Sequence, residues 1–157
     1  MRKYICLLIV LLATLKISAQ NNENFYFSNL NLKDGLSQIS VLRIFQDTKG
    51  FIWFGTRNGL NRYDGSEFVI YKHDPKDSLS LSDNHIWALA EDNDRNLWVG
   101  TARGLNKLDL KTNRITPFVD ERYGAFAKSE VRSLTVDSRN RLWVGTTKGL
   151  YLYIPAM

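Results

Sequence analysis

The stretch FIWFGTRNGL, residues 51–60, decides the fold because the chain repeats it twice more. NLWVGTARGL follows at residues 96–105 and RLWVGTTKGL at residues 141–150, so the same step of 45 residues separates all three copies. Such a period fits four-stranded propeller blades and also the longer helical repeats. Glycine, however, punctuates every unit, and short β-branched and aromatic runs such as VLRIF and EFVIY lie between the turns. The pattern therefore predicts an all-β fold in which each unit is a blade of four short strands.

The repeated residues each have a structural task in such a blade. The aspartates are expected to close the first hairpin by accepting backbone N–H groups two residues on, and the tryptophans to lie as plates between neighbouring sheets. The first glycine of each unit would allow a close approach, and the second would close a turn with positive φ. These residues are Asp47, Trp53, Gly55 and Gly59 in the first unit, Asp92, Trp98, Gly100 and Gly104 in the second, and Asp137, Trp143, Gly145 and Gly149 in the third.

The first 19 residues are predicted to be a secretory signal peptide. Arg2 and Lys3 precede an apolar run over residues 4–15, and the small residues Ser18 and Ala19 follow it. The run is shorter than the roughly 17–25 residues that a membrane-spanning helix needs. Cleavage after Ala19 would export the remainder of the chain, residues 20–157.

Export changes the charge and the cysteine content of the chain. Residues 1–19 carry three cations and no acid, so their loss lowers the formal net charge from +5 to +2. The basic composition is thus weak support for a nucleic-acid partner, and none is expected for this chain. Cys6 is the only cysteine and lies in the same segment, so neither a disulfide nor thiol chemistry is expected after cleavage.

The departures from the repeat point to where a ligand could bind. The connection KHDPKDSLSLSDNH, residues 72–85, is longer than a hairpin needs, and it is either a binding loop or a solvated linker. Trp87 is the one tryptophan outside the repeat, and it could stack on a sugar ring. It stands two residues before Leu89, a repeated apolar position, so in a regular strand both side chains would point to the same side. This favours packing of Trp87 in the core. The turns between second and third strands should share a face with the long connection. The candidate ligand residues are Arg57, Asn58, His73, Asp83, Asn84, His85, Trp87, Arg103 and Lys148.

Metal and catalytic sites are not indicated. Residues 92–96, DNDRN, begin like a calcium loop, but Leu97 and Arg103 stand where that loop needs Gly and Glu. His73 and His85 are the only histidines, and no cysteine accompanies them in a zinc pattern. No nucleophile–base–acid set or phosphate loop stands out. The chain is therefore expected to hold no metal or cofactor and not to be an enzyme.

The unit D-x5-W-[FV]-G-T-x-x-G-L resembles the repeat of the two-component regulator propeller family. Residues 31–71 and the linker HDPKDSLSLSDN, residues 73–84, are similar to the N-terminal sensor region of hybrid two-component systems of glycan-using gut bacteria. The resemblance implies a periplasmic sensor with two seven-bladed rings, a β-sandwich and a membrane helix, followed by histidine kinase, receiver and DNA-binding domains. It further implies an oligosaccharide ligand, control of polysaccharide-utilisation genes, and signalling as a homodimer.

On this basis the chain is expected to contain three consecutive blades of a seven-bladed ring and to depend on downstream blades and signalling domains that it lacks. The expected segments are an extra first strand with its lead-in at 25–40, blade one at 41–74, a linker at 75–85, blade two at 86–120, a linker at 121–130 and an incomplete blade three at 131–157. Two alternatives remain open at this point. One is a stand-alone secreted carbohydrate-binding propeller, and the other is part of a propeller lyase or hydrolase.

Overall fold

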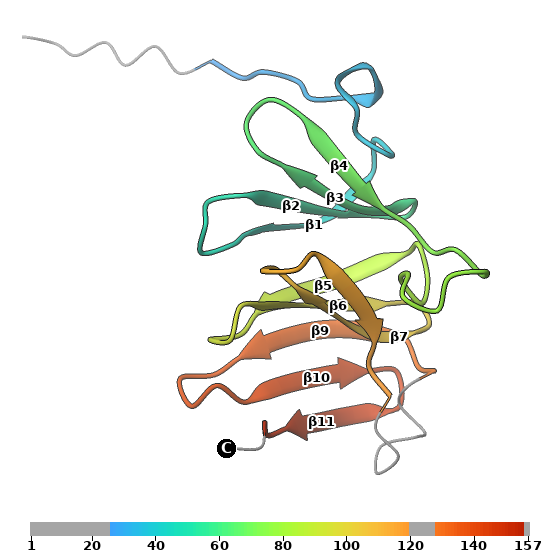
Figure 1. Ribbon diagram of the computed structural model, residues 1–157, viewed down its shortest axis with the longest axis vertical. Coiled ribbons are helices and arrows are strands. Elements are labelled where there is room, and N and C mark those ends of the chain that lie inside the picture. Colours follow the sequence, from blue (N-terminus) through green and yellow to red (C-terminus); the bar gives the residue numbers. More distant parts are fainter. Residues whose placement is uncertain (1–25, 120–127, 156–157) are drawn as a thin grey trace, which may run out of the picture.

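The computed structural model describes residues 26–119 and 128–155, which form three antiparallel sheets stacked on one another (Figure 1). The expected all-β fold class is confirmed. The only helical element in these two ranges is a 3-10 turn, η1 (Leu32–Asp34), so no helix there is long and apolar enough to cross a bilayer. The predicted signal peptide and most of the second linker lie outside the described residues, and both stay predictions.

Each sheet is built from strands that are consecutive in the chain. The first sheet has the order β1-β2-β3-β4, the second β5-β6-β7-β8, and the third β11-β10-β9. The strands of the first sheet are β1 (Val41–Gln46), β2 (Ile52–Thr56), β3 (Gly59–Tyr63) and β4 (Phe68–Tyr71). Those of the second are β5 (Ile86–Glu91), β6 (Asn96–Thr101), β7 (Gly104–Asp109) and β8 (Arg114–Pro117). Those of the third are β9 (Val131–Val136), β10 (Leu142–Thr146) and β11 (Gly149–Tyr153).

Two hydrophobic clusters hold the three sheets together. Trp53 of the first sheet packs in one cluster with Ile86 and Leu89 of β5, and Trp98 of the second sheet packs in the other with Val131 of β9. Both indoles are buried, at 0% and 2% exposure. Each tryptophan plate therefore faces the next blade along the chain, while Trp143 of the third sheet is only half-buried.

The glycine before each Thr lets the next blade approach. A Cβ built on Gly100 would lie 2.7 Å from Val131 Cγ1 and 2.8 Å from the Val131 carbonyl oxygen, and one built on Gly55 would lie 2.8 Å from Ile86 Cγ2. Such separations are too short for a side chain, so the first strand of the following blade fills the space that glycine leaves. The second glycine has a different role, since φ is +114°, +121° and +140° at Gly59, Gly104 and Gly149.

The first strands of neighbouring sheets lie against each other, and each carries the same irregularity. The pairing of each first strand with its second strand is interrupted by one extra residue near the start. A bulge of this kind bends the strand and re-aims the side chain of the inserted residue. The three inserted residues, one period apart, are Leu42, Trp87 and Arg132.

The segment before β1 differs from the extra strand expected within residues 25–40. From residue 26 onwards it pairs with none of the three sheets and runs away from the stack, as Figure 1 shows in blue. A strand needs a partner edge, and this segment meets none. Its later part instead anchors the first blade, because Leu36 is buried and the Ser37 N–H donates to Asn61 Oδ1 over 2.8 Å.

Candidate functional site

The repeated aspartates and tryptophans are joined by a hydrogen bond in every blade. The indole Nε1–H donates to the carboxylate Oδ2 over 2.9 Å in the first blade, 2.7 Å in the second and 3.0 Å in the third. The other oxygen, Oδ1, accepts the N–H of the residue two positions on in each hairpin turn. The sequence predicted the turn contact but not the indole contact, whose only signal is the constant six-residue separation. The three pairs are Asp47–Trp53, Asp92–Trp98 and Asp137–Trp143.

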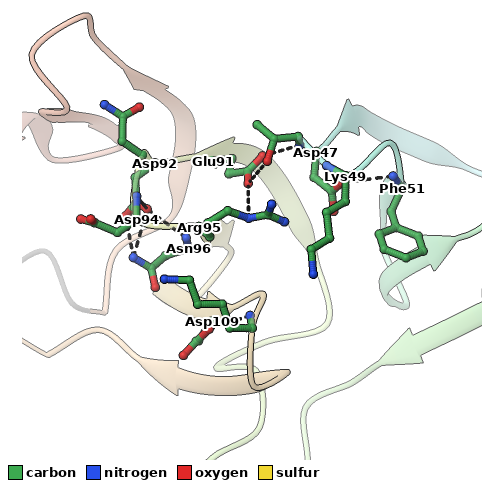
Figure 2. Close-up of polar contacts among 12 residues, drawn as sticks. Asp47, Lys49, Phe51, Glu91, Asp92, Asp94, Arg95, Asn96 and Asp109 are labelled. Carbon is green, nitrogen blue, oxygen red and sulfur yellow. Dashed lines mark hydrogen bonds and ion pairs between the residues drawn. The ribbon is translucent and has the colours of Figure 1, made fainter.

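The first hairpin turns of neighbouring blades, which lie at one end of the stack, contact each other. The carboxylate of Glu91 accepts the Thr48 N–H over 2.7 Å and the Thr48 hydroxyl over 2.8 Å, and Arg95 Nε lies 3.4 Å from the same carboxylate (Figure 2). One blade further on, Asn140 Oδ1 accepts the Asn93 N–H over 2.9 Å. The turn that imitates a calcium loop is thus engaged in contacts within and between blades. In residues 26–119 and 128–155, no group of His, Cys, Asp or Glu is placed to hold a metal ion.

The opposite end of the stack carries the candidate ligand residues. There the long connection is fixed to the second-to-third-strand turns of two blades. The Asn84 carbonyl accepts the Gly59 N–H over 2.8 Å, and the His85 carbonyl accepts the Ala102 N–H over 3.0 Å. We call this end the linker face, defined by the turns at 57–58, 102–103 and 147–148 together with residues 72–85.

Several of the candidate residues build the linker face through their polar groups. Asn84 Oδ1 accepts the His73 N–H over 2.8 Å, and His73 Nδ1 lies 2.6 Å from the Leu81 carbonyl oxygen. Asn58 Nδ2 donates to the Ser37 carbonyl over 3.2 Å. Asn84 and His73 therefore hold the connection in place, and Asn58 holds the segment before β1.

The other candidates present charge to solvent. Arg103 is paired with Asp83 at 3.5 Å, but 76% of its side chain stays exposed. Arg57 and Lys148 are exposed in the equivalent turns of the first and third blades. Arg103 also lines an open hollow of about 450 Å³ with Ser82 and Lys128. The linker face thus offers cations on a rigid scaffold.

Trp87 does not pack in the core, contrary to the expectation from its parity with Leu89. The bulge at Trp87 breaks the alternation of sides along β5, so the parity argument fails there. The indole is half-buried and belongs to neither hydrophobic cluster. It stacks on the His85 imidazole with ring centroids 4.0 Å apart, and the Arg132 guanidinium carbon lies 4.1 Å from its ring centre.

Arg132 and its partner Glu130 lie beside the candidates Trp87 and His85, and the sequence did not indicate them. Arg132 Nε donates to Glu130 Oε2 over 2.7 Å, and a second guanidinium nitrogen forms an ion pair with the same oxygen. The available signal was the period, because Glu130 and Arg132 stand 45 residues after His85 and Trp87. The repeat thus brings four varied residues, rather than four repeated ones, to one place.

The pKa of His85 reflects this position. Burial lowers the pKa below its usual value, and the charges of Arg57 and Arg132 lower it further, while Asp83 and Glu130 act in the opposite direction. The His85 imidazole is therefore harder to protonate than a solvent-exposed histidine.

Three segments of the chain match the family described as "Two component regulator propeller", at residues 35–58, 80–103 and 126–148. A 75-residue stretch is 48% identical to histidine kinase P4 of Formosa agariphila, covering 47% of this chain and 6% of that protein. The fold matches the extracellular domain of a proposed one-component system of B. thetaiotaomicron with a TM-score of 0.64 and 25% identity, over 82% of this chain and 17% of that one.

A virginiamycin B lyase of Staphylococcus aureus has the same fold at 19% identity and a TM-score of 0.50, over 74% of this chain and 42% of the lyase chain. The chain thus spans less than half of each of these proteins. Three segments of the chain are thus similar to repeats of the two-component regulator propeller family.

Proposed function

We propose that this chain is the extracellular ligand-sensing part of a two-component-type regulator. The observation that carries the proposal is the agreement of three family repeats with the fold of an extracellular sensor-system domain. The predicted signal peptide supports the same location, on the periplasmic side of a membrane. Catalysis would then belong to other parts of the regulator, in keeping with the histidine kinase that shares 48% identity over part of this chain.

The ligand we propose is an oligosaccharide, bound at the linker face. A rigid scaffold that presents a few convergent polar groups next to a hollow is the usual form of a binding site. Here the backbone of residues 72–85 is fixed to two turns, and Arg57 and Arg103 extend from those turns into solvent. Binding would act on further blades and a homodimer partner, and through them on genes for polysaccharide use. The lyase shares the fold alone, and we propose no lyase activity.

The test is a paired substitution on the linker face. Arg57→Ala with Arg103→Ala should weaken oligosaccharide binding, measured by calorimetric titration, by tenfold or more in the complete regulator. The melting temperature should stay nearly unchanged, since both side chains are largely exposed. The matched control is Lys49→Ala, which removes an exposed cation from the hairpin turn at the other end of the stack. If the pair left the affinity unaltered, the linker face would not be the site.

A further inference from the structure

We infer that Arg132, held by Trp87 and Glu130, is the anion-binding residue of the sensor and that the ligand is an oligosaccharide carrying carboxylate or sulfate groups. This inference rests on the proposed sensing function and specifies the chemistry of its ligand. Trp87 acts in it as a positioning residue that supports Arg132, rather than as a plate for a sugar ring.

The place of Arg132 in the fold makes it accessible to a ligand. It is the inserted residue of the bulge in β9, equivalent to Trp87 in β5 and Leu42 in β1. These bulges stand at the start of three adjacent first strands, next to the linker face, since Val131 and Ile86 pair with the last residues before the turns. Because a bulge re-aims a side chain, this position is free to vary while the repeat keeps the blade intact.

The guanidinium of Arg132 is already oriented before a ligand arrives. Trp87 lies below its planar group at 4.1 Å, and Glu130 engages one edge through Nε at 2.7 Å. The side chain nonetheless remains 49% exposed, so part of the donor fork faces solvent. A guanidinium fixed in this way loses little conformational entropy when it binds, and its fork matches a carboxylate or sulfate through paired charge-assisted hydrogen bonds.

The surrounding charge favours an anion. The linker face and the residues beside it carry seven cations and four acids. The cations are Arg57, Lys72, Lys76, Arg103, Lys128, Arg132 and Lys148, and the acids are Asp74, Asp77, Asp83 and Glu130. The cations thus outnumber the acids by three. A neutral sugar would leave that surplus uncompensated, but a carboxylate or sulfate would neutralise it.

The indole itself is a poor platform for a sugar. Trp87 already stacks on His85 and carries the Arg132 cation, so a sugar ring would have to displace one of them. In the part of the chain that the structure describes, Trp87 Nε1 and His85 Nε2 are buried and have no hydrogen-bond partner. Neither nitrogen faces solvent, so neither is presented to a sugar hydroxyl.

The test compares two tetrasaccharides of the same linkage and ring size on the complete regulator. Tetragalacturonate carries a carboxylate on every ring, and maltotetraose carries none. A sulfated carrageenan tetrasaccharide provides the second anion, and sodium sulfate tests a plain anion site. We expect an acidic tetrasaccharide to bind at least tenfold more tightly than both maltotetraose and sodium sulfate in calorimetric titration.

The variants assign that preference to Arg132. Arg132→Gln should reduce binding of the acidic tetrasaccharide at least tenfold, and Arg132→Lys should restore only part of it. Arg114→Gln, an exposed arginine of β8, is the matched control and should change nothing. Equal binding of maltotetraose, or of sodium sulfate, would overturn the inference, as would acidic binding that survives Arg132→Gln. If maltotetraose bound equally well and lost this binding in the Arg57→Ala, Arg103→Ala variant, the proposed function would stand and only the inference would fail. If no oligosaccharide bound, the inference and the proposed function would both be contradicted.

Discussion

Trp98 donates its indole N–H to Asp92 over 2.7 Å, and both residues are buried inside the second blade. The same carboxylate accepts the backbone N–H groups of Asp94 and Asn96. Both of its oxygens also accept from the side-chain Nδ2 of Asn96. A single side chain thereby joins the first hairpin turn to the plate that packs against the next blade. Turn geometry and packing between blades are coupled in this protein through that one carboxylate.

Asp92→Ala should lower the free energy of unfolding by about 2–3 kcal/mol, because it leaves several donors without their acceptor in a buried place. Chemical denaturation followed by tryptophan fluorescence measures the loss. Asp94→Ala is the control in the same turn; its exposed carboxylate makes only a long contact of 3.5 Å to Asn140, so the change should stay within about 0.5 kcal/mol. If the two variants lost similar free energy of unfolding, the Asp92 carboxylate would not be the group that couples the turn to the packing between blades.

The fold was predictable because its signals are local and repeated. Glycine spacing, hairpin aspartates and a 45-residue period all indicate the same blade, and the structure has two sheets of four strands and one of three in chain order. The Asp92–Trp98 bond was not predictable in the same way. Two residues six positions apart meet only when the hairpin has a particular register, and the sequence does not state that register.

Trp98→Ala should destabilise the chain clearly more than Trp143→Ala. Trp98 is 2% exposed and packs against the third sheet, so its removal should cost about 3–5 kcal/mol. Trp143 is only half-buried, so its removal loses less packing. Its indole makes the same kind of hydrogen bond, to Asp137. Urea denaturation of the two variants compares the costs directly. Equal costs would argue against the stacking of the blades in chain order.

Gly100→Ala should destabilise the chain more than Gly145→Ala does. The added Cβ at Gly100 would meet the backbone oxygen of Val131 at 2.8 Å, and backbone cannot move aside without shifting a strand. At Gly145 the nearest atom is the hydroxyl of Ser133, which can rotate away. A cost of about 1–3 kcal/mol is expected for the first variant, as for other overpacked sites, and a smaller one for the second. Thermal unfolding of both proteins provides the comparison, and the reverse order would refute the proposed contact.

The candidate site was only partly predictable. Position in the repeat correctly places Arg57, Asn84 and Arg103 at one end of the stack, because turns and connections follow strand order. Trp87 was placed wrongly, since the rule that side chains alternate assumes an unbroken strand and β5 has a bulge at that residue. Contacts between blades, such as that of Arg132 with Trp87, depend on how the sheets pack, and local sequence patterns do not indicate them.

The environment of His85 sets the pH dependence of the linker face. Arg57 of the first blade and Arg132 of the third add positive charge near the imidazole, and Asp83 and Glu130 add negative charge. Burial is the largest influence, and together these effects place the pKa of His85 below the usual 6.5. In the unfolded chain the imidazole is free to take up a proton at its ordinary pKa.

Acidification from pH 7.5 to pH 5 should therefore destabilise the folded chain through His85. The unfolded state binds a proton as the pH falls through about 6.5, whereas folded His85 binds it only at lower pH, so stability is full above this window and declines within it. Denaturation midpoints at the two pH values measure the loss. His85→Gln removes the titrating group and should show a smaller loss than the unaltered chain. If His85→Gln lost as much stability on acidification as the unaltered chain, the imidazole would not be the group responsible.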